Sequence, residues 1–382
     1  PFWAAFFTWT AAAAVVGLLA GHQPKLVLGE GSMIINVGGM MLLVAGVPAS
    51  EYVSSRLFAR FIQTAAVVSA GLFVLDSVGF RWSNNSIPDL PFYRFGGFGA
   101  DAATLFSGLG VIALVLGLAR PRHLGSRAAL IIPGLVLILS HLASAQRAAR
   151  LGLYVTVLLI LVIACLPTAR RRLGFTPRQV SIAGAAALAI VCAAVFLPAV
   201  VSANAPKVNL TSSAKDFSAT SRQGSIDSRF NQWNVVRTRI FEKPLVGEGL
   251  GGTFVSYSEG HKMLVEGDIS HNIALDLLRR TGVVGVALAL SALLAVLAQT
   301  ISVWRNHPST QIAALGAAAG TLIAGLLAKG MVESIFEKDR IAVFLGLTLG
   351  LAISAWLSWG RRPDVPTTPG AVPAPRHLSP SR

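Results

Sequence analysis

The chain has 382 residues, of which 53% are hydrophobic and 13% are charged, and its formal net charge is +15 at pH 7. Apolar runs of roughly 18 to 22 residues, the length that spans a bilayer as a helix, recur along it and predict an all-α, polytopic integral membrane protein. The positive charge does not indicate nucleic acid, because the arginines stand in short clusters between the apolar runs, where they suit membrane lipids.

The apolar windows predict about ten spans in chain order. They lie near residues 2 to 20, 31 to 48, 57 to 79, 100 to 119, 128 to 144, 151 to 166, 179 to 201, 273 to 303, 310 to 330 and 341 to 359. If the spans alternate, five arginine groups fall on one side, which the positive-inside rule makes cytoplasmic. These groups are Arg56 and Arg60; Arg120, Arg122 and Arg127; Arg170, Arg171, Arg172 and Arg178; Arg305; and Arg361 and Arg362.

One long polar segment, residues 202 to 270, is expected on the opposite, periplasmic side. Within it Arg229, Trp233, Val236 and Ile240 recur at helical spacing, which predicts an amphipathic helix over the membrane mouth. The "GEGLGG" that comes next resembles a phosphate loop only superficially, because it follows a helix and not a strand. We expect it to be a flexible turn.

Four parts of the chain are therefore expected. They are an N-terminal transmembrane bundle (1–201), a periplasmic loop with the amphipathic helix (202–270), C-terminal transmembrane helices (271–360) and a tail (361–382). The tail is rich in proline and has few apolar residues to bury, so we expect a disordered cytoplasmic end.

Two arginines stand where the predicted spans leave only a short external connection. Arg147 and Arg150 occur in "HLASAQRAARLG", between the spans at 128 to 144 and 151 to 166. Guanidinium groups grip phosphate oxygens through paired hydrogen bonds, which favours a lipid diphosphate as the partner. Arg229 and Arg237 of the long segment could join the same cationic site. The alternative is that these arginines only reach out to lipid headgroups.

His271 occurs at the mouth of an apolar run, in "ISHNIALDLLRRTGVVG". Asp268 or Ser270 could cap the helix that follows, which places His271 in its first turn. The positive end of a helix dipole favours a neutral imidazole there, as a general base requires. The alternative is a histidine that only marks the water boundary.

The sequence contains no D-x-D pair, no H-E-x-x-H and no histidines spaced i, i+4, so we expect neither a metal nor a cofactor. Ionisable residues within the spans are also sparse. Glu30 and Lys329 fall near predicted span ends, whereas an ion-coupled transporter usually needs charged groups at mid-depth.

Two stretches resemble known motifs. "SHNIALDLLRRTGVVG" resembles the His-Asn…Gly-x-x-Gly signature of the O-antigen ligase and O-antigen polymerase superfamily. "SRFNQWNVVRTRIFEKPLVGEGLGGTF" is similar to the segment that precedes it there, with an arginine, a tryptophan four residues on, and Pro-x-x-Gly-x-Gly. The recognisable motifs cover residues 128 to 285. The resemblance implies a GT-C-type glycosyltransferase of about twelve spans, so the ten expected here would lack an N-terminal hairpin.

The resemblance also implies site residues. His271 matches the histidine proposed as general base, Arg229 the loop arginine, and Arg147 the arginine at the end of a span. Asn272, Arg150 and Arg237 are expected to help bind substrate. The family pattern often reads Ser-Arg, whereas Ser144 stands apart from Arg147 in "SAQR", so Arg147 and Arg150 remain alternatives.

The activity implied is that of an O-antigen ligase in the bacterial inner membrane. It would transfer O-antigen polysaccharide from undecaprenyl diphosphate to a lipid A-core sugar hydroxyl in the periplasmic leaflet, without a metal and with inversion. A single dominant external loop favours the ligase. An O-antigen polymerase that joins lipid-linked repeats and a non-enzymatic transporter of lipid-linked glycan remain alternatives.

Overall fold

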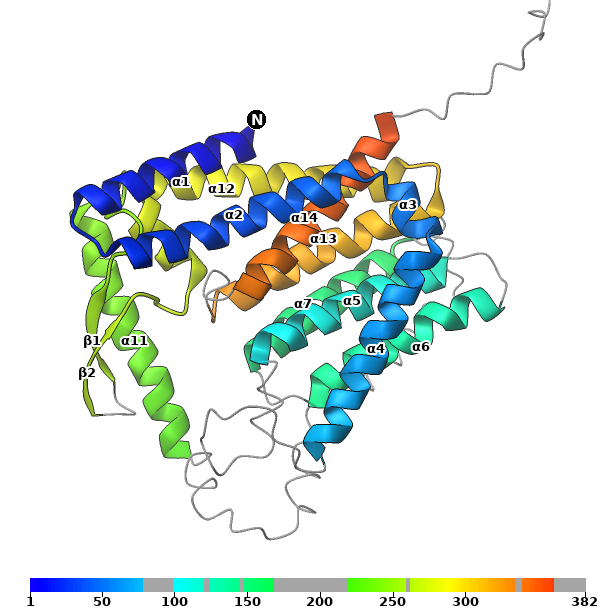
Figure 1. Cartoon of the computed structure of the whole chain (residues 1–382), viewed down its shortest axis with the longest axis horizontal. Helices are drawn as coiled ribbons and strands as arrows, with labels where there is room; N and C mark the ends of the chain where they lie inside the picture. The colour runs from blue at the N-terminus through cyan, green and yellow to red at the C-terminus, as the bar shows by residue number, and fades with distance from the viewer. Residues whose placement is uncertain are drawn as a thin grey trace, which may run out of the picture.

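The structure is a computed structural model, and it describes residues 1–77, 99–119, 124–143, 147–167, 219–258, 262–333 and 339–360. The described part is mostly helical, with one small β-hairpin (Figure 1). Its helices are α1 (Phe2–Leu19), α2 (Pro24–Gly46), α3 (Ala49–Ser54), α4 (Arg56–Ser77), α5 (Gly99–Ala119), α6 (Leu124–Ala143), α7 (Arg147–Cys165), α11 (Ala219–Glu242), α12 (Ile273–Asn306), α13 (Thr310–Gly330) and α14 (Asp339–Gly360), and its strands are β1 (Phe254–Ser258) and β2 (Met263–Gly267).

Five helices are long and apolar enough to cross a bilayer: Phe2–Leu19, Pro24–Gly46, Ile273–Asn306, Thr310–Gly330 and Ile341–Trp359. Shorter apolar helices continue the pattern at Thr104–Ala119, Arg127–Leu139 and Arg150–Cys165. Nine of the ten expected spans overlap a helix, and the one at 179–201 lies outside the described residues, as does the tail at 361–382. The all-α membrane character is confirmed. The number of spans stays a prediction.

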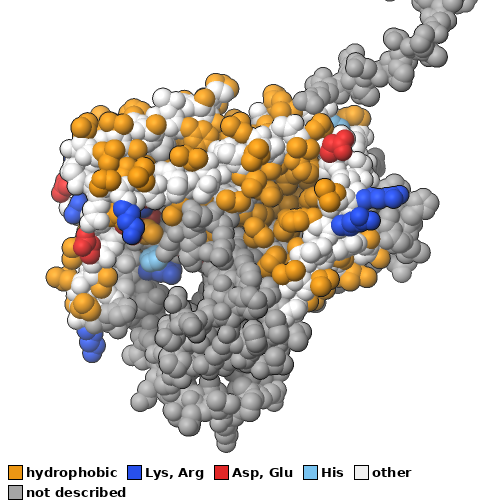
Figure 2. Space-filling view, in the orientation of Figure 1, with side chains coloured by type: hydrophobic (Ala, Val, Ile, Leu, Met, Phe, Trp, Pro, Cys, Tyr) orange, Lys and Arg blue, Asp and Glu red, His pale blue; other side chains and the backbone are white. Residues whose placement is uncertain are grey.

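Small residues let the helices approach closely. A Cβ built on Gly152 of α7 would lie 2.8 Å from the carbonyl oxygen of Gly325 in α13, and α13 is buried mainly through alanines and glycines. Interfaces of this kind are typical of helices that pack in a membrane. The outer sides of α1 and α2 expose large aliphatic residues instead, and Figure 2 shows hydrophobic side chains spread over one side of the bundle. The core therefore lies between helices, with apolar surface outside.

Several helices share one end of the bundle. The Ser354 Oγ donates to the Val47 carbonyl at 2.5 Å, and the Gln63 Nε2 donates to the Ala129 carbonyl at 3.1 Å. These bonds join the C-terminal ends of α2 and α14, and the N-terminal parts of α4 and α6. The described arginines that were expected on the cytoplasmic side lie on these elements or at the adjoining C-terminus of α12: Arg56, Arg60, Arg127 and Arg305.

The opposite end carries α11 and the hairpin. Helix α11 packs against α12 at this end and runs away from the bundle, with the strands beside it (Figure 1). The strands are antiparallel, from Phe254 opposite Gly267 to Ser258 opposite Met263. A helix lies where one was expected, and its amphipathic role over the membrane mouth stays a prediction. The hairpin was not expected, because each strand is only five residues long and β1 follows a glycine-rich loop.

Helix α12 is interrupted at Gly282, whose φ of 65° and ψ of −173° are not helical. The backbone N–H groups of Val283 and Val284 donate to the carbonyls of Pro244 and Leu245 at 2.8 and 3.3 Å. A Cβ on Gly282 would lie 2.2 Å from the Leu245 carbonyl oxygen, so only glycine fits. The break lets the chain after α11 dock against α12. The part beyond it is about 36 Å long at 1.5 Å per residue, enough to span a bilayer.

Candidate functional site

The N-cap of α12 is Asn272, whose Oδ1 accepts from the N–H groups of Ala274 and Leu275 at 3.0 and 3.2 Å. The predicted caps, Asp268 and Ser270, are therefore wrong. His271 lies one residue before the cap and not in the first helical turn. The expectation that the helix dipole acts on its imidazole from within that turn is therefore wrong. Asparagine and serine cap equally well, and the Ser270 hydroxyl, the group that would cap, donates to the Asn272 carbonyl at 3.3 Å instead.

His271 adopts a left-handed backbone conformation, with φ of 56°. This conformation costs a non-glycine residue about 1 kcal/mol. The residues on either side are fixed by side-chain bonds: Trp233 Nε1 to the Ser270 carbonyl at 2.8 Å and Asn272 Nδ2 to the Met331 carbonyl at 3.0 Å. Strain of this kind persists where the surroundings over-determine the backbone, and it clusters at functional sites.

The C-terminal end of α13 is the meeting point of the predicted site residues. The Arg229 Nη1 donates to the Val332 carbonyl at 2.8 Å, next to the Met331 carbonyl that accepts from Asn272. Trp233, one turn after Arg229 in α11, bonds the residue before His271. The structure therefore brings Arg229, His271 and Asn272 together from α11 and the start of α12.

The start of α7 lies at the same place. A Cβ on Gly152 would lie 3.3 Å from the Cβ of Lys329, in the last turn of α13. Arg147 and Arg150 belong to the first turn of α7, not to a connection as predicted. Arg150 is partly buried, and the side chain of Arg147 lies outside the described residues. Cations at a helix N-terminus oppose the helix dipole, which a bound anion would offset.

The structure does not bring Arg237 to this site. Its side chain is exposed, with the guanidinium 5.7 Å from the centre of the Phe241 ring in the same helix. It follows Arg229 by about 12 Å along the axis of α11, at 1.5 Å per residue. Its role as a substrate-binding residue stays a prediction, because its described contact is with Phe241 and not with the end of α13.

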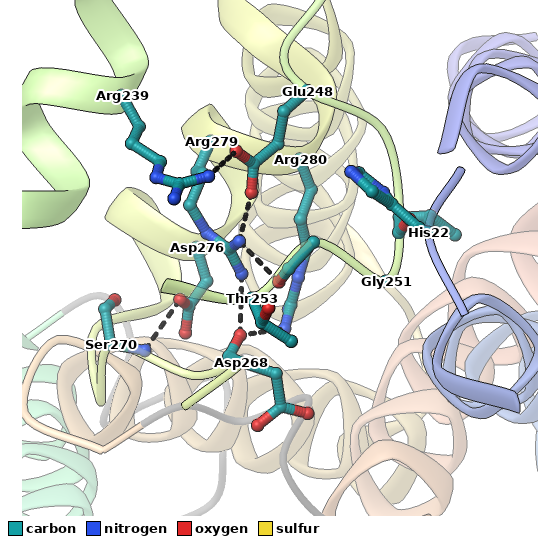
Figure 3. Close-up of polar contacts among 12 residues, drawn as sticks. His22, Arg239, Glu248, Gly251, Thr253, Asp268, Ser270, Asp276, Arg279 and Arg280 are labelled. Atoms are coloured by element: carbon teal, nitrogen blue, oxygen red, sulfur yellow. Dashed lines mark hydrogen bonds and ion pairs between the residues drawn. The ribbon is translucent and has the colours of Figure 1, made fainter. Parts of the chain in front are cut away.

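Sequence reasoning missed a buried arginine pair, Arg279 and Arg280 (Figure 3). Their exposed fractions are 1% and 5%. Arg279 is paired with the Glu248 carboxylate and donates to the carbonyls of Gly252 and Asp268, each at 2.6 Å. Arg280 lies 2.7 Å from the Glu30 carboxylate and 2.9 Å from the Asp268 carbonyl. Their charge is the signal that could have predicted this pair, because arginines at the start of an apolar run require buried partners.

The partners of this pair correct two predictions. Helix α2 begins at Pro24, so Glu30 lies inside a membrane helix and not at its edge, where its carboxylate also accepts from the Gly251 N–H at 2.7 Å. The loop at 247–252 is buried and not a flexible turn. Its N–H groups at Glu248 and Gly249 donate to the carbonyls of Arg279 and Arg280 at 2.8 and 3.2 Å.

The sequence marks Lys329 only as a charge near the end of a predicted span. Its exposed fraction is 1%, and its Nζ lies 2.9 Å from the Glu333 carboxylate. It occupies the last turn of the helix whose end holds Arg229 and Asn272. Lys329 therefore belongs to the surroundings of the candidate site.

Within the described ranges, no group of three or more histidine, cysteine, aspartate or glutamate residues is placed to hold a metal ion. No protein-family model matches the chain, and no curated protein sequence matches it. The function is therefore argued from the chemistry of the residues at the end of α13.

Proposed function

We propose that the chain is a membrane glycosyltransferase of the O-antigen ligase type. It transfers O-antigen polysaccharide from undecaprenyl diphosphate to a sugar hydroxyl of lipid A-core, at the periplasmic face of the bacterial inner membrane. The observation that carries the proposal is the convergence at one end of α13. Arg229, the His271–Asn272 pair and the start of α7 meet there, although they are far apart along the chain.

The cations at this end suit a departing diphosphate. A guanidinium has five N–H donors, so the bond from Arg229 to the Val332 carbonyl uses only part of what it can donate. Arginine binds phosphate through two parallel bonds, and charge-assisted bonds of this kind are about twice as strong as neutral ones. Arg147 or Arg150, in the first turn of α7, adds a second cation beside the positive end of a helix. Negative charge that develops on the leaving group is stabilised in this way.

His271 is the proposed general base. The acceptor hydroxyl oxygen forms a bond to the anomeric carbon, the bond from that carbon to the diphosphate oxygen breaks, and its electron pair leaves with the diphosphate. The hydroxyl proton passes to the imidazole of His271. A single displacement inverts the anomeric carbon. The guanidinium groups supply the positive charge, so the proposed mechanism uses neither a metal nor a cofactor.

The test is a comparison of lipopolysaccharide from cells with and without the protein. Loss of a ligase leaves core-only lipopolysaccharide and accumulates lipid-linked polymer, whereas loss of a polymerase leaves lipopolysaccharide with a single repeat. Purified protein in vesicles with both lipid substrates completes the test. Transfer there supports the ligase, and movement of the donor between leaflets without transfer supports the transporter.

A further inference from the structure

Lys329 is the only charged residue of α13, and it is one of the most deeply buried side chains in the described part of the molecule. A charge at the end of an apolar span is costly unless it is paired, and such residues usually serve a function. Its counter-ion, Glu333, is one turn further on, with 17% of its side chain exposed against 1% for Lys329. The two ends of this ion pair therefore have unequal access to water.

The pair lies within the candidate site. The N–H groups of Val332 and Glu333 both donate to the Lys329 carbonyl at 3.0 Å, so the helical turn continues past the end of α13. The Val332 carbonyl in that turn accepts from Arg229. On the other side, the Lys329 Cβ faces Gly152 of α7, two residues after Arg150. Lys329 thus stands between the two arginine-bearing elements of the proposed diphosphate site.

We propose that Lys329 is an additional cation for the donor diphosphate and that Glu333 is its exchangeable counter-ion. On donor binding, the Lys329 ammonium passes from the Glu333 carboxylate to a phosphate oxygen. Glu333, the more exposed partner, turns to water. This inference rests on the proposed donor class, a polyprenyl diphosphate.

Three physical arguments support the exchange. Lysine carries a compact charge on a flexible four-carbon stem, so its head can move between two acceptors. The ammonium is paired before and after the exchange, so no buried charge is left alone. The Glu333 carboxylate belongs to a side chain that is already 17% exposed, so its hydration requires little rearrangement. A diphosphate also carries more negative charge than the carboxylate that it replaces.

A purely structural ion pair would behave differently. A cation in the last turn of a helix stabilises the helix by itself, because it faces the negative end of the dipole. If that were the whole role, loss of either partner would weaken donor binding alike, or leave it alone. The exchange predicts opposite effects, since Glu333 competes with the phosphate for Lys329.

The experiment measures binding of undecaprenyl diphosphate to the full chain in lipid nanodiscs, without acceptor. Lys329→Met is expected to weaken binding about tenfold or more, as expected for the loss of one charge-assisted contact. Glu333→Gln is expected to tighten it several-fold. The matched controls are Glu242→Gln, at the last residue of α11, and Lys243→Met, directly after it; both residues are exposed, and neither variant is expected to change binding. Inorganic pyrophosphate and undecaprenyl monophosphate serve as comparison probes for the headgroup and the lipid chain.

The exchange is overturned if Glu333→Gln weakens binding or leaves it unchanged, or if Lys329→Met binds as the wild type does. If the Glu333→Gln protein does not fold, the double variant Lys329→Met/Glu333→Gln replaces it, because it leaves no unpaired charge. That protein must bind as weakly as Lys329→Met, and wild-type affinity would refute the exchange. The two proposals can fail separately. If the variants bind as predicted but the vesicle assay shows no glycan transfer, the exchange is supported and the transferase function is refuted.

Discussion

Two groups of arginines lie at the same end of the bundle and differ in what surrounds their charge. Arg279 and Arg280 are buried, and each is paired with a carboxylate, from Glu248 and Glu30 respectively. Arg229 donates to a neutral carbonyl and is only partly buried. The buried pair follows His271 closely in the sequence, whereas Arg229 lies on a different helix.

The difference distinguishes arginines whose charge is neutralised inside the fold from one whose charge is available to a ligand. The charge of an arginine that is paired with a buried carboxylate is neutralised locally, so it attracts a phosphate only weakly. Breaking such a pair leaves a buried charge without a partner. An arginine on a carbonyl keeps its full charge. Nearness to the candidate base along the chain is therefore a poor guide to which arginine is available for the proposed diphosphate. The buried pair ties α2, α12 and the loop at 247–252 together, and the end of α13 carries the proposed chemistry.

The largest effect is expected at His271. His271→Gly removes the imidazole, and transfer should fall by about 10² to 10⁴-fold, the usual contribution of a general base. Stability should not fall, because glycine adopts positive φ without strain. Transfer in vesicles and thermal unfolding are measured on the same preparation. A glycine variant that transfers near the wild-type rate would remove His271 from the mechanism.

Substitutions in the buried pair, Arg279 and Arg280, are expected to lower the stability of the fold. Arg280→Met leaves the Glu30 carboxylate unpaired inside a membrane helix and should destabilise the fold by about 3 to 5 kcal/mol. The double variant Arg280→Met/Glu30→Gln leaves no charge behind and should recover most of that loss. Unfolding in denaturant measures both. An Arg280→Met protein that folds normally but does not bind undecaprenyl diphosphate would contradict the account, because Arg280 would then belong to the binding site and not to the fold.

Arg229→Lys keeps the charge but loses the paired hydrogen-bonding geometry of the guanidinium. The transfer rate should fall about 10-fold or more, because a hydrogen bond to a charged group contributes about 1.5 to 3 kcal/mol. Arg237→Lys is the matched control on the same helix, and its exposed side chain predicts a near-normal rate. Equal losses in the two variants would mean that a general positive potential matters and a specific contact does not.

A smaller effect is expected at the other end of α12. Burial lowers the pKa of His307 below its ordinary value of 6.5, although backbone hydrogen bonds at Ser309 and Ser358 partly oppose this. The unfolded chain therefore binds the proton more readily. This contribution to stability is complete above about pH 6.5 and decreases as the pH falls towards the lowered pKa. Melting temperatures between pH 7.5 and 5.5 should show a shallower decrease in His307→Gln, while transfer at pH 7.5 stays unchanged.

The smallest expected effect is that of a chelator. The proposed mechanism draws its positive charge from guanidinium groups, so excess EDTA should leave the rate of transfer unchanged. The assay is run with EDTA and, in parallel, with EDTA followed by excess Mg²⁺. A rate that falls and then recovers would show that a metal takes part.

The spans and α11 were predictable because their signals are local. The length of the apolar runs predicts the spans. Helix α11 is predicted by the helical spacing of four residues, Arg229, Trp233, Val236 and Ile240. The cap of α12 was not predictable, because Ser270 and Asn272 are both good caps and the bonds that their side chains make in the fold decide between them.

The loop "GEGLGG" looked flexible because composition cannot show its buried partners. Its fixed shape depends on the carbonyls of Arg279 and Arg280, about thirty residues later. The convergence at the end of α13 was not predictable either. It depends on the backbone carbonyls of Met331 and Val332, which have no signature in the sequence. The sequence suggests the residue types of the candidate site, but it does not show the backbone groups that bring them together.

The most direct test of this account is a structure of the protein in a nanodisc with undecaprenyl diphosphate bound. The diphosphate should lie at the end of α13, within hydrogen-bonding distance of Arg229, with the anomeric side facing His271. A diphosphate bound against Arg279 and Arg280, or at the end of the bundle that carries Arg56 and Arg305, would contradict it.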